Sequence, residues 1–506
     1  MDSRTKNTKR NIITSYVCTL LSFLFQFVSR YYITRCLGEQ YLGLSSLFTS
    51  VLQVLNMAEL GFSGAIVYNM YRPIADGDDK TVCALLNYYR RVYRIIGVIV
   101  LIVGTIVMPF IPKLINGSYP STINLYFLFG LYVVNTAVSY FLFAYKTSLL
   151  EAVQRLDITK VVYTIVQLCQ YTFQLVALIV FKNYYLFVIG MILGTCAKNI
   201  FSAKAARKYY PQYECCGELP NSVKADIIQR VKGLLVCNIS SVTYSSLDSI
   251  ILSTFIGLTS VAIYGNYSVV LTGLLTIITI IRSSMQASVG NSVAKESIEK
   301  NYKDLLMWQY LFSVIGTFCT ACLLSLYQPF MTLWMGGELL LPIRDVIIIC
   351  AWFNVSVVQH AFFLYLSANG LWWELRWPYI GSTVCNLVLN IVLGKRFGIT
   401  GIVIASFFSS FVFGLVWQCN LIFRLYFKTS TRKYFERQIL YFLFTLFVSV
   451  ASFYITTSIH LNGIIGLIVK AITSTIVSTI VAIALYSRSN MFKDAVVFVK
   501  KVIRTN

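Results

Sequence analysis

Stretches of about twenty apolar residues recur along the whole chain, and this pattern limits the fold more than any other feature of the sequence. A helix of about that length crosses a hydrocarbon core of ~30 Å. Of the 506 residues, 57% are hydrophobic and only 12% are charged, which lies outside the range of soluble globular domains. We therefore expect an all-α integral membrane protein with about fourteen transmembrane helices, the second of them continuous over residues 41–70.

The basic residues indicate the orientation of the chain. The formal net charge is +22, but Lys and Arg lie between apolar segments rather than in one patch, so we expect no nucleic-acid partner. With the N-terminus in the cytoplasm, roughly 34 of the basic residues fall in or beside cytoplasmic segments and roughly 7 on the other side. This bias predicts two cytoplasmic termini in a bacterial inner membrane. The first apolar run is too long for a signal peptide, so we interpret it as the first helix.

The remaining motifs argue against an enzyme. No G-x-x-x-x-G-K-[ST] phosphate loop is present, and the expected external loops are too short to form a catalytic domain. The 13 Cys do not have metal-ligand spacing, and His360 and His460 are too far apart for a zinc site. We therefore expect no catalytic residue, no metal and no cofactor.

Polar side chains follow one face of several expected helices. The first helix carries Ser15, Thr19, Ser22, Gln26 and Ser29 at three- and four-residue steps, and Gln53, Asn56 and Glu59 repeat the pattern in the second. The fifth carries Thr164, Gln167, Tyr171 and Gln174, and the seventh Asn238, Ser241, Ser245 and Asp248. Such faces must meet each other or water, because lipid cannot satisfy them. They form either a hydrated lumen or helix-packing contacts.

The charges inside the expected spans are few. Glu59 and Asp248 are the acids, and Arg30 is the most deeply placed Arg. An ion pair that fixes helix packing is one interpretation; an anion site formed by cations, with acids that carry a coupling ion, is the other. Leu37-Gly38 resembles Ile256-Gly257, which suggests an internal duplication. On that alignment Arg30 lies beside the equivalent of Asp248, and we expect both to face a shared cavity.

The run from Ser29 to Leu44, SRYYITRCLGEQYLGL, resembles the first-helix signature of bacterial polysaccharide flippases. Glu59-Leu60-Gly61-Phe62 is similar to the E-L-G-[FL] that ends their second helix. The second half resembles the corresponding helix pair at Leu247–Leu252, at Val261–Tyr267 and at Ala287–Asn291. These flippases form the Wzx-like polysaccharide transporter family of the multidrug/oligosaccharidyl-lipid/polysaccharide exporter superfamily.

The resemblance implies a MATE-like, pseudo-twofold pair of six-helix bundles. The bundles would span residues 1–204 and 228–424, joined by a cytoplasmic linker at 205–227. Two extra transmembrane helices at 436–486 and a basic cytoplasmic tail at 487–506 would follow.

The resemblance also implies a cargo, an undecaprenyl-pyrophosphate-linked oligosaccharide, with a polysaccharide polymerase and glycosyltransferases as pathway partners. Cavity cations bind pyrophosphate in these relatives, a role that passes to Arg30, then to Arg35 or Arg282. Tyr264, Asn266, Tyr267, Gln26, Gln53 and Asn56 would suit sugars. Glu59 and Asp248 are the candidates for H⁺ or Na⁺ coupling.

Three alternatives stay open. A multidrug exporter or a lipid II flippase of the same superfamily would share the fold. Arg30 would repel the organic cations of the first, and the signature around Arg30 fits the polysaccharide branch better than the second. A membrane-embedded polysaccharide polymerase is disfavoured by the short external loops.

Overall fold

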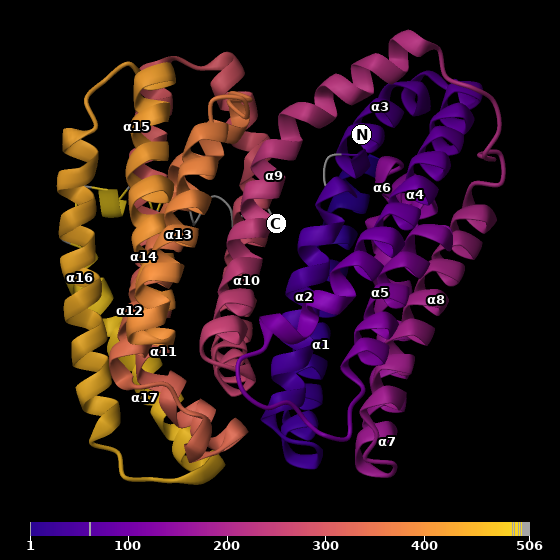
Figure 1. The fold of residues 1–506 in the computed structure, drawn as a ribbon. Coiled ribbons are helices and arrows are strands. Elements are labelled where there is room, and N and C mark those ends of the chain that lie inside the picture. The colour runs from indigo at the N-terminus through magenta and orange to yellow at the C-terminus, as the bar shows by residue number, and fades with distance from the viewer. Residues whose placement is uncertain are drawn as a thin grey trace. The chain divides into compact units, whose positions relative to one another are not determined.

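The computed structural model describes residues 2–59, 62–487, 489, 491–493, 495 and 497, and its described residues form helices and no strand. They divide into two compact units, Met1–Ala262 and Ile263–Asn506 (Figure 1). The all-helical prediction is confirmed. The predicted basic tail at 487–506 lies largely outside the described residues.

Unit 1 consists of the helices up to the first turn of α10. Within it, α7 packs along α8, α1 packs against α7, and α2 against α9. Figure 1 shows α7 and α8 side by side. The bounds are α1 Asp2–Cys36, α2 Glu39–Leu55, η1 Asn56–Glu59, α3 Phe62–Asp76, α4 Asp79–Val107, η2 Met108–Leu114, α5 Leu125–Phe141, α6 Tyr145–Ala152, α7 Leu156–Ile179, α8 Tyr184–Tyr209 and α9 Asn221–Phe255.

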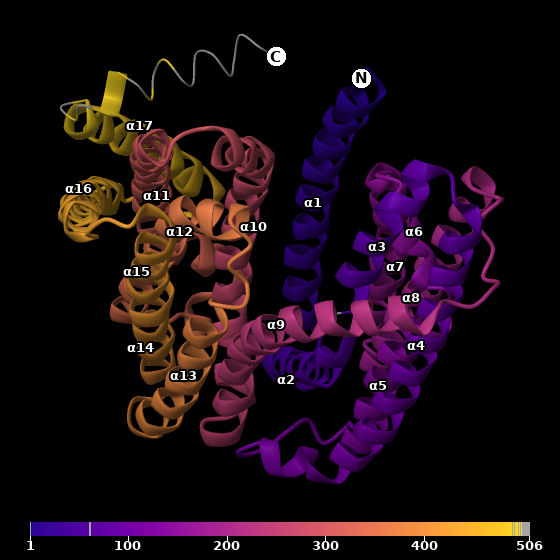
Figure 2. The ribbon, with the colours of Figure 1, turned by 90° about the horizontal axis from the view of Figure 1, so that it is seen from above.

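Unit 2 contains the rest of α10 and all later helices. Its long central helix α11 contacts α12, α16 and α17, an arrangement visible in Figure 2. The bounds are α10 Leu258–Lys295, α11 Ile298–Met335, η3 Gly337–Leu339, α12 Ile343–Ala368, α13 Arg376–Phe397, α14 Ile399–Ser409, η4 Ser410–Trp417, α15 Gln418–Ile422, η5 Phe423–Phe427, α16 Arg432–Thr457 and α17 Gly463–Tyr486.

Within the described residues, 12 helices are long and apolar enough to cross a membrane, or 13 if the bent pair α5 and α6 is one span. The chain is therefore a multi-pass membrane protein. The expected count of about fourteen includes the predicted second span, 41–70, which is not one continuous helix. This span breaks after Leu55 into the 3-10 turn η1 and then α3, with Leu60 and Gly61 outside the described residues.

The helix bounds support the internal duplication. Gly38 and Gly257 are 219 residues apart (38 to 257), and both have positive φ, 110° and 126°. The same separation relates both ends of α1 and α9, the starts of α2 and α10, and the starts of α4 and α11. Asp78 and Ser297 (78 to 297) are also equivalent, since each caps a helix by accepting from the backbone N–H three residues later.

Glycine permits a close helix contact in unit 1. A Cβ atom on Gly43 of α2 would lie 2.2 Å from the carbonyl oxygen of Leu258 at the start of α10. Gly43 lies in the motif that carried the family resemblance, so this signature residue has a packing role. Leu42, Leu44 and Leu258 bury their side chains in the cluster around this contact.

The last two helices are held to unit 2 by hydroxyl groups. Ser452 of α16 is hydrogen-bonded to Ser325 of α11 and to Ser474 of α17, each at 2.9 Å. At a second position along the same three helices, Thr317 of α11 is hydrogen-bonded to Thr445 of α16 and Tyr486 of α17. Two apolar helices thus gain specific contacts where lipid offers no hydrophobic driving force. The division into two units places α9 in unit 1.

Candidate functional site

The polar faces predicted on the first and fifth spans meet in unit 1. Ser22 of α1 donates to Oε1 of Gln167 on α7 at 2.7 Å. Phe25 and Tyr171 stack beside them, with ring centroids 5.3 Å apart. Gln174, expected on the same face, instead donates to the carbonyl of Phe187 on α8. These polar faces therefore serve partly as contacts between helices.

The polar faces of α2 and α9 also meet. Ser246 of α9 donates to Oε1 of Gln53 at 3.1 Å, and Thr243 donates to the sulfur of Met57 at 3.3 Å. The amide oxygen of Asn56, one turn along, is buried without a hydrogen-bond partner among the described residues. A buried acceptor of this kind is costly unless a ligand, ion or water satisfies it.

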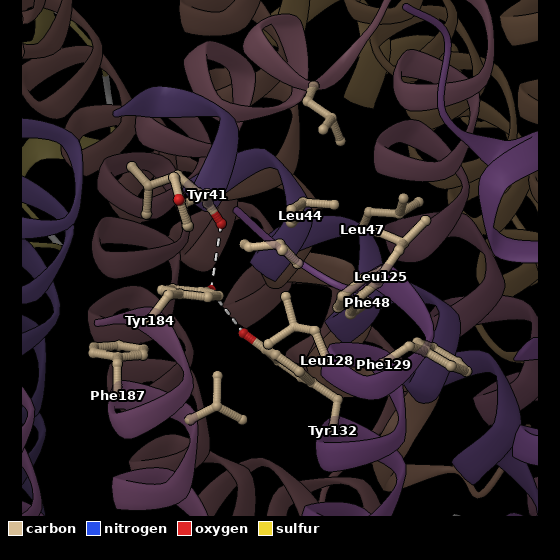
Figure 3. Close-up of a cluster of buried hydrophobic side chains, with 14 of the residues drawn as sticks. Tyr41, Leu44, Leu47, Phe48, Leu125, Leu128, Phe129, Tyr132, Tyr184 and Phe187 are labelled. Atoms are coloured by element: carbon tan, nitrogen blue, oxygen red, sulfur yellow. Dashed lines mark hydrogen bonds between the residues drawn. The ribbon is translucent and has the colours of Figure 1, made fainter. Parts of the chain in front are cut away.

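Arg30 lies beside a network of tyrosine hydroxyls. Its half-buried side chain is within electrostatic range of Tyr184 at the start of α8. The Tyr184 hydroxyl is hydrogen-bonded to the Tyr132 hydroxyl at 2.9 Å and donates to the carbonyl of Tyr41 (Figure 3). Tyr132 in turn bonds Ser45 at 3.0 Å. Residues of three helices, α2, α5 and α8, thus fix the phenol oxygen of Tyr184.

Glu59 lies in the break between α2 and α3 and is held by two tyrosines. Tyr140 of α5 donates to its Oε2 at 2.5 Å, and Tyr93 of α4 donates to its Oε1. Tyr89, one turn before Tyr93, donates to the Tyr93 hydroxyl at 2.7 Å. Among the described residues no Lys or Arg forms a salt bridge with Glu59. The carboxylate is therefore stabilised by neutral donors.

The duplication shows that this cluster belongs to one half only. The residue 219 positions after Glu59 is Ile278, inside the unbroken helix α10, and the equivalent of Tyr93 is the buried Phe312 (93 to 312). The acid, its phenol partner and the helix break are thus absent together from the second half. Their coincidence indicates one coordinated feature of unit 1.

Arg282 is a half-buried cation of unit 2. Its guanidinium carbon lies 4.6 Å from the ring centroid of Phe363, and His360 is within electrostatic range of the guanidinium. Its Nε is buried and has no hydrogen-bond partner among the described residues. Cation–π contact stabilises the charge without using the in-plane N–H donors, which leaves them available to an anion.

The other predicted site residues differ in their exposure. Arg35 is exposed at the end of α1, over the Tyr31 ring, and Gln26 is exposed as well. Asp248 is buried in α9, with 4% of its surface exposed. Tyr264, Asn266 and Tyr267 are all buried in unit 2.

The hydroxyl of Tyr267 is used inside the fold. It donates to Gln328 at 2.6 Å and accepts from the backbone N–H of Leu341. Its donor therefore contacts α11 and its acceptor binds the segment between η3 and α12.

The sequence matches the family of polysaccharide biosynthesis proteins over residues 8–285, more than half of the chain. The chain belongs to this family. The resemblance read from the residues around Arg30 and Gly43 is thereby confirmed. A search of curated protein sequences finds no match.

Solved structures similar to this polysaccharide biosynthesis protein are membrane transporters. The lipid II flippase MurJ in an inward closed conformation has a TM-score of 0.70 at 14% identity, covering 94% of this chain and 99% of that chain. An inward-facing multidrug resistance MATE transporter of the MOP superfamily has 0.65 at 14%, with 83% and 99% covered. A Vibrio cholerae MATE transporter has 0.56 at 13%, with 85% and 100% covered. The MATE-like fold is therefore confirmed.

The sequence analysis did not predict the tyrosines that lie near Glu59 and Arg30 in this family member. Tyr89 and Tyr93 are four residues apart and so share a helix face, which was an available signal. Tyr140 and Tyr184 belong to other helices, and no local spacing relates them to Glu59 or Arg30. Only the tertiary fold brings these phenols to the two charges.

Proposed function

We propose that this chain is a flippase for undecaprenyl-pyrophosphate-linked oligosaccharide repeat units. It moves them from the cytoplasmic to the external leaflet of a bacterial inner membrane, with both chain termini in the cytoplasm. The product feeds the assembly of a surface polysaccharide: an O-antigen, a capsule or an exopolysaccharide. Family membership and the fold shared with transporters and a lipid flippase support this proposal.

The observation that carries the proposal is the placement of Arg30. A guanidinium binds phosphate oxygens in bidentate fashion, and low surrounding dielectric strengthens that attraction. Tyr184, which is within electrostatic range of Arg30, is fixed by Tyr132 and the Tyr41 carbonyl. We assign Arg30 the pyrophosphate. Arg282, whose Nε has no hydrogen-bond partner in the described part of the chain, is the corresponding candidate in unit 2.

The polar groups that remain available support a sugar-binding role near the same cargo. Gln26 and Gln53 are exposed, and the Asn56 oxygen lacks a partner in the described chain. Amides match sugar hydroxyls because they both donate and accept hydrogen bonds. Tyr264, Asn266 and Arg35 stay secondary candidates, and Tyr267 is the weakest because its hydroxyl is already engaged.

Coupling to an H⁺ or Na⁺ gradient is assigned to Glu59, with Asp248 as a second acid. As a carboxylate, Glu59 accepts from both Tyr93 and Tyr140. Once Glu59 is protonated, one of its oxygens carries a hydrogen that needs an acceptor, and the negative charge that strengthens both phenol hydrogen bonds is lost. Protonation would therefore loosen the α2–α3 break from α4 and α5, which is the kind of local change that alternating access requires.

Deletion of the gene tests the proposed function directly. Lipid-linked repeat units should accumulate in the cytoplasmic leaflet, inaccessible to an external glycosidase, and surface polysaccharide should disappear. Rescue of cells depleted of their lipid II flippase would instead support the lipid II alternative. Accumulation of external, unpolymerised repeat units would indicate a polymerase, and increased sensitivity to organic cations alone would indicate a multidrug exporter.

A further inference from the structure

A polar pocket of about 540 Å³ lies within unit 2, where the ends of α11 and α16 meet the start of α17. It is distinct from the surroundings of Arg30 and Arg282. The polar side chains that line it are Ser325, Gln328, Thr332, Thr456, Thr457, Asn462 and Lys470. No Asp or Glu is among its described lining residues.

Lys470 is the unusual member of this lining. It lies seven residues into α17 (463 to 470), a helix that meets the criteria for a membrane span. The side chain is half-buried and has neither a salt bridge nor a hydrogen bond with any described residue. A lysine without a counter-charge at membrane depth is rare and is usually functional.

Most neighbouring polar groups have their donors engaged already. Thr332, Thr456 and Thr457 each donate to the carbonyl four residues earlier in their own helix. The Gln328 amide donates to the Leu341 carbonyl. The donors that remain for a ligand are the Lys470 ammonium and the Asn462 amide, which has no partner among the described residues and does not cap α17. Both favour an anion.

The pocket mouth is apolar. Leu333, Ile343 and Leu461 line it and are 40%, 43% and 50% exposed. Ile464 and Ile465 continue this apolar surface on α17, at 66% and 72%. A ligand that contacts this region must therefore combine an anionic group with hydrocarbon chains.

We propose that this pocket binds the phosphate group of an anionic membrane lipid. Lys470 and Asn462 contact the phosphate, and the acyl chains lie along the exposed side chains of α17. On the expected topology the pocket faces the external leaflet. A lipid in this place would join α11 to the α16–α17 pair, which the Ser325–Ser452–Ser474 chain already connects.

The alternative is that Lys470 extends to the water interface without binding a lipid, as amphipathic side chains do near helix ends. That interpretation predicts no preference among lipid headgroups. The two are separated by native mass spectrometry of the full-length protein, delipidated and titrated with phosphatidylglycerol or phosphatidylcholine. Wild type should retain phosphatidylglycerol about fivefold better, the effect expected of one basic side chain near a membrane surface.

Three variants complete the experiment. Lys470→Gln should lose the preference and Lys470→Arg should keep it. Lys182→Gln, which changes an exposed lysine in the loop before α8, should behave as wild type. Retention of the full preference by Lys470→Gln, or its loss in Lys182→Gln, overturns the proposal. So does displacement of the lipid by millimolar inorganic phosphate, because the site would then hold a soluble anion.

A measurement on the wild type alone covers the case in which Lys470→Gln does not fold. Phosphatidylglycerol should raise the melting temperature in detergent more than an equal amount of phosphatidylcholine. The difference should shrink at high ionic strength, since the contact is electrostatic. Equal stabilisation by the two lipids would contradict the proposal.

Discussion

The hydroxyl of Tyr140 donates a hydrogen bond to Oε2 of Glu59 at 2.5 Å, and this contact joins α5 to the break between α2 and α3. Tyr93 of α4 holds the other carboxylate oxygen. The break is thus bonded to two helices through one ionisable group. A change of protonation at Glu59 would therefore affect three parts of unit 1: the α2–α3 break, α4 and α5.

Glu59→Gln tests this arrangement, because the amide keeps one acceptor oxygen and removes the charge. We expect normal amounts of folded protein but transport that no longer responds to a collapsed proton or sodium gradient. Tyr140→Phe should instead lower the free energy of unfolding by about 1.5–3 kcal/mol, the value of a hydrogen bond to a charged group. The measurements are transport in vesicles and melting in detergent. Unchanged gradient dependence in Glu59→Gln would remove Glu59 from the coupling role.

Arg30→Ala should reduce transport of the lipid-linked repeat unit at least about tenfold, since it removes charge-assisted hydrogen bonds to the pyrophosphate. Arg30→Lys should restore part of the activity, because an ammonium keeps the charge but not the bidentate geometry. Arg207→Ala, at an exposed position in the last turn of α8, is the matched control and should stay near wild type. Complementation of surface polysaccharide in a deletion strain, with membrane protein quantified, is the readout. Normal polysaccharide with Arg30→Ala would exclude the proposed contact.

Tyr184→Phe is expected to act through Arg30 rather than on the cargo. The ring and its stacking on Phe187 remain, whereas the oxygen beside the guanidinium is lost. We expect a smaller transport defect than in Arg30→Ala. Combined with Arg30→Ala, Tyr184→Phe should cause little further loss, so that a double-mutant cycle gives strong coupling. Independent, multiplicative defects would show that Tyr184 acts elsewhere.

Gly43→Ala should destabilise unit 1 by about 1–3 kcal/mol, the typical cost of overpacking. The new Cβ would lie 2.2 Å from the Leu258 carbonyl oxygen, so the two segments must separate. Gly64→Ala is the control, because a Cβ there has no neighbour within 4 Å and should be neutral or slightly stabilising. Heating followed by size-exclusion chromatography compares the two. Equal survival of both variants would contradict the close contact.

Asp78 gives a pH-dependent prediction outside the membrane spans. Its side chain accepts from the Thr81 hydroxyl and backbone N–H, and these hydrogen bonds lower its pKa below the ordinary value. The stabilising contribution of the charged group is therefore present above the unfolded-state pKa and is lost as the pH falls through the lowered pKa. Asp78→Ser keeps a capping oxygen without the charge. The melting difference from wild type should be largest near neutral pH and vanish in acid; a constant difference would argue against the shift.

The sequence predicted the helical fold and the family well, because both depend on long apolar runs and local motifs such as that around Gly43. It also singled out Arg30 and Glu59, since a charged residue is unusual wherever it lies in a span. It did not predict the break at Asn56–Glu59, because the apolar periodicity continues through it and its contacts with Tyr93 and Tyr140 come from other helices. The Lys470 pocket was missed for the same reason: α17 read alone is an ordinary apolar helix with one lysine.

The 219-residue register has a consequence for how this protein can change. In a helix, each inserted or deleted residue rotates everything beyond it by about 100°. The shared spacing from Asp2 to Asp79 and from Asn221 to Ile298 therefore means that neither half has gained or lost a residue there relative to the other. The side chains of the two halves differ, as Glu59 and its equivalent Ile278 demonstrate, whereas the number of residues in this segment is the same. Over this segment, substitutions rather than net insertions or deletions distinguish the two halves.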